Sequence, residues 1–119
     1  MDKKTLGARG ESLAARHLQS NGYRIITRNF RTRNGEIDLI ATHRNTLIFI
    51  EVKTRIGNLY GQPQEAITPW KLRALIRTAQ YYKMLNPTLP ESMRIDMVAI
   101  ELDCSSKLLQ LEHIENITQ

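Results

Sequence analysis

The fold of this chain is decided by one stretch, which reads GEIDLIATHRNTLIFIEVK from Gly35 to Lys53. Two apolar runs rich in Ile and Val flank a polar turn, His43-Arg44-Asn45-Thr46, and this pattern is typical of a β-hairpin over residues 35–54. If the turn is centred between Arg44 and Asn45, residues whose numbers sum to 89 lie opposite each other. The stretch therefore predicts both two strands and their register.

In that register Asp38 lies opposite Glu51, and Glu36 lies opposite Lys53. Because side chains alternate across a strand, these four residues share one face of the hairpin. The same face also carries Ile40 and Phe49. The other face is a core surface that carries Ile37, Leu39, Ala41, Ile48, Ile50 and Val52.

The opposed carboxylates of Asp38 and Glu51 predict a cation site. Two like charges directly opposite each other destabilise a sheet, and their Cβ atoms lie only about 4.5–5.5 Å apart. Mg²⁺ takes one or two carboxylates, keeps several waters and accepts phosphate oxygens, and such an ion can activate water for attack on phosphorus. Lys53 is placed to orient that water, so the hairpin suits Mg²⁺- or Mn²⁺-dependent hydrolysis of a phosphodiester.

Simpler interpretations of the same residues stay open. A Glu-x-Lys pattern is ordinary on a solvated strand face, and Glu36 with Lys53 can form a surface ion pair of little consequence. Asp38 alone can be a turn or pairing residue. A turn of odd length or a β-bulge would move Asp38 off the face that carries Glu51.

Length and composition indicate one soluble domain over residues 1–119. Apolar residues make up 41% of the chain and charged residues 24%, as in ordinary globular proteins. No apolar run approaches the roughly 18 residues that a membrane span needs. The single cysteine, Cys104, excludes an intramolecular disulfide and fits a reducing cytosol, so we expect a cytoplasmic protein.

Positive charge is concentrated in the half of the chain that contains the hairpin. Residues 1–60 hold 11 Lys and Arg against 5 Asp and Glu, whereas residues 61–119 hold 6 against 7. This asymmetry suits a protein that binds the phosphate backbone of nucleic acid. The alternatives are solubility and the protection of an edge strand by charge. The predicted phosphate-binding residues lie in or near the strand at 23–32 and after the hairpin: Arg24, Arg28, Arg31, Arg33 and Arg55.

The remaining elements are helices at 3–21 and from Thr68 to about Leu85, and strands at 93–102 and 108–114. The order α-β-β-β-α-β-(β) predicts an α/β domain with a mixed sheet flanked by helices. Arg94 and Asp96 share a face and are expected to brace the sheet. Glycines and a proline at 57–63 predict a loop, with Gln64 and Glu65 near the site.

Taken together, these segments resemble a known family. Gly10-Glu11, Gly35–Ala41, Phe49–Arg55 and Arg94–Val98 look like the bacterial YraN-like family of uncharacterised proteins. An acidic residue on the second strand and Glu-x-Lys on the third resemble the PD-(D/E)-x-K nuclease superfamily, which includes restriction endonucleases and Holliday-junction resolvases. The resemblance covers roughly Gly7 to Ile100, and Ile37 stands where the superfamily name has proline.

The resemblance implies a restriction-endonuclease-like fold and a site for Mg²⁺ or Mn²⁺. Asp38 and Glu51 would be metal ligands, Lys53 the catalytic lysine, and Glu11 the helix-borne acidic residue that completes the site in resolvase-like members. Helical spacing alone makes Glu11 a solvated residue at the edge of its helix's apolar stripe.

The leading hypothesis is therefore a metal-dependent DNA endonuclease, with branched or damaged DNA as candidate substrates. A non-catalytic nucleic-acid-binding protein on the same fold is the alternative, and a module that binds an acidic protein is a third. Resolvases of this kind act as dimers, which leaves a homodimer open.

Overall fold

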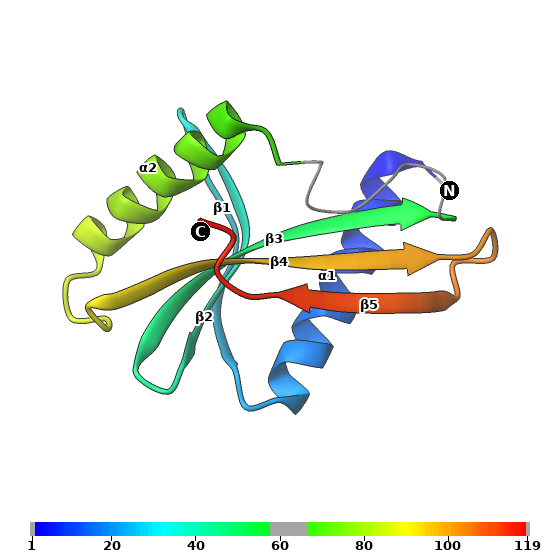
Figure 1. Cartoon of the computed structure of the whole chain (residues 1–119), viewed down its shortest axis with the longest axis horizontal. Helices are drawn as coiled ribbons and strands as arrows, with labels where there is room; N and C mark the ends of the chain where they lie inside the picture. The colour runs from blue at the N-terminus through cyan, green and yellow to red at the C-terminus, as the bar shows by residue number, and fades with distance from the viewer. Residues whose placement is uncertain (1, 58–66, 119) are drawn as a thin grey trace.

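The computed structural model describes residues 2–57 and 67–118 and contains two helices and five strands (Figure 1). The order α-β-β-β-α-β-β matches the order predicted from the sequence. In chain order the elements are α1 (Lys3–Ser20), β1 (Arg24–Thr32), β2 (Gly35–His43), β3 (Thr46–Ile56), α2 (Pro69–Leu85), β4 (Ser92–Leu102) and β5 (Leu108–Ile114).

The strands form one mixed sheet in the order β1-β2-β3-β4-β5. Neighbouring strands are antiparallel except β3 and β4, which are parallel and are connected through α2. This arrangement is expected, because a hairpin turn can join antiparallel strands while parallel strands need a crossover. The predicted α/β class with a mixed sheet is confirmed.

The central hairpin has the predicted register. Its pairs run from Leu39 opposite Ile50 to His43 opposite Thr46. The turn residues Arg44 and Asn45 both have left-handed backbone angles, φ 48° and 62°. That geometry matches a two-residue turn whose twist fits the flanking strands.

Each face of the sheet carries its own hydrophobic core. On one face α1 packs its small residues against the inner strands, and that cluster includes Ala14, Ala15, Leu18, Leu39, Ala41, Ile48, Ile50 and Val98. On the other face α2 packs over a second cluster that includes Ile37, Ile40, Leu47, Phe49, Leu75, Ala79 and Tyr82. The middle strands are therefore apolar on both faces, apart from a few polar positions.

The side-chain alternation of β2 breaks at Asp38. Ile37 was expected on the face of Leu39, but it packs in the α2 cluster while Leu39 packs in the α1 cluster, so the prediction for Ile37 is wrong. Across the sheet, Asn29 lies between the pairs Arg28–Leu39 and Phe30–Ile37 and has φ 54°. Asn29 therefore departs from the extended backbone of β1 opposite Asp38, while the register shift between β1 and β2 lies between Ile25 and Thr27.

The helix ends follow the sequence signals. Thr68 caps α2 by accepting a hydrogen bond from the Lys71 backbone, Pro69 is the first helical residue, and Asn86 follows the last turn. After α1, Gly22 adopts φ 86°, the left-handed angle that glycine supplies at the end of a helix. Neither described helix has the length and apolar character needed to span a membrane.

Candidate functional site

The carboxyl groups of Asp38 and Glu51 meet where β2 and β3 separate. The hydrogen-bonded ladder ends at Leu39–Ile50, one pair before Asp38 and Glu51. Beyond it the Asp38 carboxylate accepts a hydrogen bond from the Val52 backbone N–H (2.8 Å), and both the Asp38 and Glu51 carboxyls line the same cleft. The predicted approach of these two acids is confirmed. Beyond the last ladder pair, the Asp38 side chain takes the place of a backbone carbonyl as the acceptor for the Val52 N–H.

Burial and the charge of a neighbouring acid raise the pKa of both carboxyls. Burial raises the pKa of Asp38, and the nearby Glu36 charge adds to this, while the Val52 N–H opposes it. Burial, followed by the charge of Asp38, raises the pKa of Glu51 to about 7. Two neighbouring carboxyls of raised pKa form a site where a cation would compensate the unfavourable negative charge.

Lys71 is a site residue that the sequence interpretation missed. Its Nζ lies 3.5 Å from Glu51 Oε1. The available signal was its helical spacing, because Lys71 stands one turn before the buried Leu75 and so shares its face. Its charge lowers the pKa of Glu51 and partly offsets the effect of burial.

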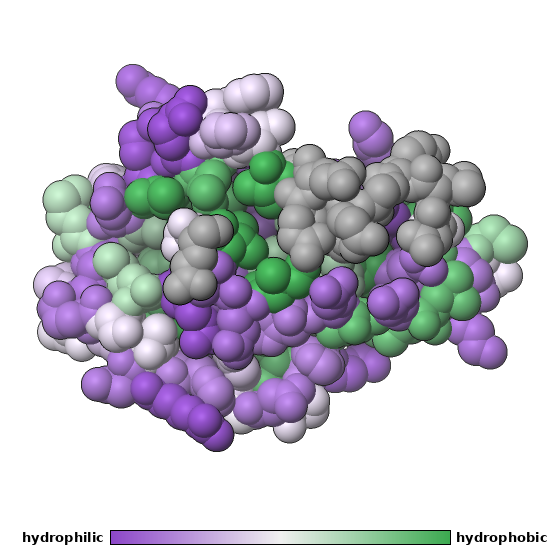
Figure 2. All heavy atoms as spheres, in the orientation of Figure 1, coloured by the Kyte–Doolittle hydropathy of each residue, from purple (hydrophilic) through white to green (hydrophobic). Residues whose placement is uncertain are grey.

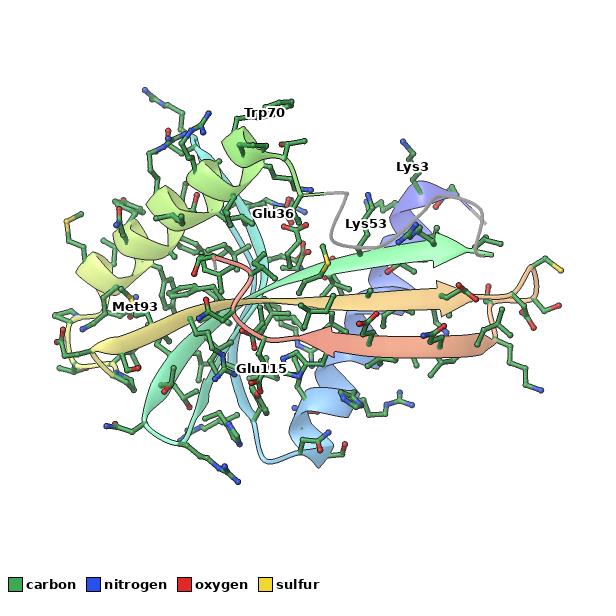
Figure 3. The ribbon with its side chains drawn as sticks, in the orientation of Figure 1. Lys3, Glu36, Lys53, Trp70, Met93 and Glu115 are labelled. Carbon is green, nitrogen blue, oxygen red and sulfur yellow. The ribbon has the colours of Figure 1, made fainter. Side chains whose placement is uncertain are left out.

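The acid pair opens into a cleft of about 250 Å³ between the sheet and the first turns of α2. Figure 3 shows Glu36, Lys53 and Trp70 along this side of the molecule, whereas Glu115 lies below the sheet. The cleft joins acidic groups to one ammonium group and a small apolar wall. Its lining residues are Gly35, Glu36, Asp38, Glu51, Lys71, Ala74 and Leu75.

Glu11 approaches the same acids from α1. Burial raises the pKa of Glu11, and the charge of Asp38 adds to this, while a hydrogen bond with Asn29 opposes it. Gly10 permits this approach, because a Cβ at that position would overlap the Thr54 side chain on β3. Glu11 is therefore half-buried beside the site, and not the solvated residue that helical spacing alone favours.

Lys53 and Glu36 are not partners. Glu36 lies opposite Arg31 on β1 and forms its ion pair there, with 3.3 Å between Arg31 Nε and Glu36 Oε1. The alternative of a Glu36–Lys53 ion pair is therefore wrong. Lys53 is half-buried two residues beyond Glu51, and its charge helps to stabilise the Glu51 carboxylate.

Of the predicted phosphate-binding arginines, two lie beside the cleft and three lie elsewhere on β1 and β3. Arg31 and Arg33 are exposed and flank the turn between β1 and β2, next to the cleft residues Gly35 and Glu36. Arg24 is also exposed but lies seven residues earlier on β1, about 20 Å from Arg31 at strand spacing. Arg28 is exposed on the middle of β1, and Arg55 is half-buried on β3.

The metal-ligand set is smaller than the sequence implied. Within residues 2–57 and 67–118, no three side chains of His, Cys, Asp or Glu are grouped as metal ligands. The pair of Asp38 and Glu51 still fits Mg²⁺ or Mn²⁺, since Mg²⁺ commonly takes one or two carboxylates and completes its shell with water and phosphate. Gln64 and Glu65, which were expected near the site, lie outside the described residues, as do residues 58–63 of the predicted loop.

A second polar cluster surrounds Asp96 on β4, in the α1 face of the sheet. The fully buried carboxylate accepts two hydrogen bonds from Arg94 (2.9 and 3.0 Å), one from His113 Nε2 (2.8 Å) and one from the Asn116 backbone N–H (2.9 Å). Arg94 also donates to the Tyr23 hydroxyl. The predicted brace between Arg94 and Asp96 is confirmed, while His113 and Asn116 were not foreseen.

Comparison with known proteins places the chain among bacterial relatives. Residues 10–100 match the sequence model described as "Uncharacterised protein family UPF0102". A UPF0102 protein of Geobacter metallireducens is 40% identical over 116 residues, which span 98% of this chain and 93% of that protein. A UPF0102 protein of Leifsonia xyli is 45% identical over 116 residues, which span 97% of both chains.

Among solved structures, Pyrococcus furiosus SfsA in complex with Ca²⁺ is similar to this chain, with a TM-score of 0.43 and 17% sequence identity. The match spans 97% of this chain and 64% of the SfsA chain. A likeness of this degree carries no argument about the fold or the site.

Proposed function

The chain belongs to the uncharacterised protein family UPF0102. We propose that it is a metal-dependent DNA endonuclease, with branched or damaged DNA as candidate substrates. The observation that carries the proposal is the approach of two carboxyls of raised pKa, the half-buried Asp38 and the buried Glu51, in a cleft beside Lys71. A restriction-endonuclease-like identity of the fold is part of the same proposal.

Asp38 and Glu51 are the groups that would hold Mg²⁺ or Mn²⁺. When bound, the ion supplies positive charge to a phosphoryl oxygen and lowers the pKa of a water molecule. The Val52 N–H occupies Oδ2 of Asp38, which leaves Oδ1 as the oxygen that would bind the ion. Glu11 would act beside this pair, directly or through a water molecule.

Two lysines complete the chemistry that the proposal needs. Lys53, on β3 beyond Glu51, would orient the attacking water. Lys71 lies at the mouth of the cleft and would stabilise the charge of the scissile phosphate, since ammonium groups bind phosphate as point charges. Arg31 and Arg33 lie beside the cleft and would hold the neighbouring phosphates of the backbone.

Cleavage of labelled DNA tests the proposal. Duplex, single-stranded, flap and four-way-junction DNA would be incubated with the wild-type protein, with Asp38→Asn, and with Glu91→Gln as a matched control. Glu91 is exposed and pairs only with Lys83 in the described part of the chain. We expect the wild type and Glu91→Gln to cleave in Mn²⁺ or Mg²⁺, and Asp38→Asn to bind DNA without cleaving it.

Other outcomes decide between the alternatives. Equal cleavage by the wild type and Asp38→Asn would show a different site or a contaminant and would overturn the proposal. Binding of DNA that weakens with salt, with no cleavage by any variant, would favour the non-catalytic nucleic-acid-binding protein. Circular dichroism of Asp38→Asn checks that the variant is folded.

A further inference from the structure

Trp70 is an exposed aromatic residue at the edge of the cleft. Its exposed fraction is 68%, although tryptophan is on average among the more buried residues. It is also the single tryptophan of the chain. A large flat ring that is left in water at the entrance to a polar site offers a surface for another flat group.

Helix geometry places this ring on the same side of α2 as one residue of the cleft wall. Trp70 and Ala74 are four residues apart on α2, so they share one face of the helix, and Ala74 lines the cleft. The next residue, Lys71, reaches Glu51. Figure 3 shows Trp70 projecting outward from the first turn of α2, above Glu36.

Positive charge surrounds the ring. Arg73 and Arg77 lie three and seven residues after Trp70 and are exposed on the same side of α2. Gly35 packs against Ala74 and Thr78, which brings the turn with Arg31 and Arg33 beside the helix. In Figure 2 strongly hydrophilic side chains gather at this corner of the molecule, beside the beginning of α2.

We propose that Trp70 is a stacking platform for an unpaired base of DNA whose backbone lies in the cleft. The substrate class would then be DNA with a single-stranded nucleotide next to the scissile phosphate, and not continuous duplex. This inference rests on the proposed nuclease function and narrows its substrate. Aromatic rings within a basic groove bind single strands in this way, because every base presents a flat face while paired bases keep theirs inside the helix.

A protein partner is the competing occupant of this ring, because exposed tryptophans also serve as anchors of protein interfaces. The neighbouring arginines favour a polyanion. The cleft below the ring holds the acidic pair that the phosphate chemistry would use. Stacking therefore accounts for the ring and its surroundings together.

The single tryptophan allows a direct test by intrinsic fluorescence. The full-length protein would be titrated in EDTA, where metal-dependent cleavage cannot occur, with single-stranded oligonucleotides and with continuous duplex of the same length. We expect the single strand to quench the fluorescence strongly and the duplex to quench it little. Fluorescence anisotropy of labelled DNA would measure the affinities of the variants in the same buffer.

Three variants separate stacking from general binding. Trp70→Ala is expected to lose about tenfold in affinity for the single strand, with the duplex affinity unchanged. Trp70→Phe keeps a ring and should retain most of the affinity. Met84→Ala, which alters an equally exposed apolar residue (67%) near the end of α2, should change nothing.

Two results together would overturn the stacking proposal and leave the nuclease proposal standing. They are wild-type fluorescence that the single strand does not quench, and an affinity of Trp70→Ala for the single strand equal to that of the wild type. An equal loss for both forms of DNA would also overturn it. Quenching by the single strand without any cleavage in Mn²⁺ would support stacking and reject the nuclease. Absence of binding to either DNA would reject both.

Discussion

Asp38 and Asp96 lie on strands of the same sheet, β2 and β4, but the groups that surround their two carboxylates differ. Asp96 is surrounded by donors: Arg94, His113 and the Asn116 backbone fill its acceptor positions. Asp38 receives one backbone N–H and lies near the acids Glu51, Glu36 and Glu11, with the charge of Lys71 as a partial offset. The charge of Asp96 is balanced by its donors, whereas the surroundings of Asp38 have an excess of negative charge.

The pKa values of the two aspartates differ in direction for that reason. Burial alone would raise the pKa of Asp96, but hydrogen bonds from His113, Arg94 and Asn116 outweigh it and hold the pKa below its usual value. At Asp38 burial prevails and the pKa is raised. We infer that the Asp96 cluster stabilises the fold, whereas the Asp38–Glu51 pair lowers stability and is kept for a ligand.

The largest expected effect separates activity from folding at Asp38. If the proposed function holds, Asp38→Asn should lower the cleavage rate by about a thousandfold or more, because it would remove a ligand of the ion that stabilises the transition state. Its free energy of unfolding should equal or exceed that of the wild type, since a repulsive charge is lost. A cleavage time course and a urea titration on the same preparation measure both quantities.

Asp96 should behave in the opposite way. Asp96→Asn leaves the charged Arg94 without its buried partner, so we expect the free energy of unfolding to fall by about 3–5 kcal/mol. Urea titration measures the loss, and any remaining folded protein should keep its cleavage rate. If Asp96→Asn were as stable as the wild type, the distinction between the two aspartates would be lost.

The pH dependence of stability sharpens the contrast at Glu51. Because its pKa in the folded protein is about 7 and its ordinary value is 4.5, the folded state binds more protons between these values. The stability of the metal-free protein should therefore fall as pH rises through this range. Glu51→Gln should be more stable than the wild type by up to about 3 kcal/mol at about pH 8, and the difference should vanish below the unfolded pKa.

Thermal unfolding of both proteins in EDTA across this pH range checks the sign. The opposite result would be a free energy of unfolding of the wild type that rises from acid to neutral pH relative to that of Glu51→Gln. It would contradict the conclusion that burial of the Glu51 carboxylate is unfavourable.

The smallest expected effect concerns the helix that brings Glu11 to the acids. Gly10→Ala should lower the free energy of unfolding by about 1–3 kcal/mol, because the new methyl group overlaps Thr54 and pushes α1 away from β3. Gly7→Ala is the matched control on the same helix, since a Cβ there meets no atom within 4 Å. It should raise stability by up to about 1 kcal/mol through helix propensity. Equal effects of the two substitutions would contradict the close approach at Gly10.

Local signals were sufficient for the elements and for the hairpin register. The turn at Arg44 and Asn45 fixed which residues of β2 and β3 are opposite, and this brought Asp38 and Glu51 together. Thr68 and Pro69 likewise marked the beginning of α2. Each of these features depends on residues close together in sequence, whose backbone preferences are known.

The remaining features of the two sites depend on tertiary contacts. The change of face at Asp38 lies opposite a left-handed Asn29 on the neighbouring strand, which alternation in β2 does not reveal. The contact of Lys71 with Glu51 depends on how α2 packs over the sheet. His113 and Asn116 reach Asp96 across 17 and 20 residues of sequence, so no local pattern could assign them to it.

Calorimetric titration with Mn²⁺ tests most directly whether the Asp38–Glu51 pair is kept for a cation. The wild type and Glu91→Gln are expected to bind Mn²⁺ and to release protons on binding at about pH 6–7, because the ion would displace protons from carboxyls of raised pKa. Asp38→Asn is expected not to bind. Equal binding by the wild type and Asp38→Asn, or no binding by the wild type, would contradict the assignment of this site.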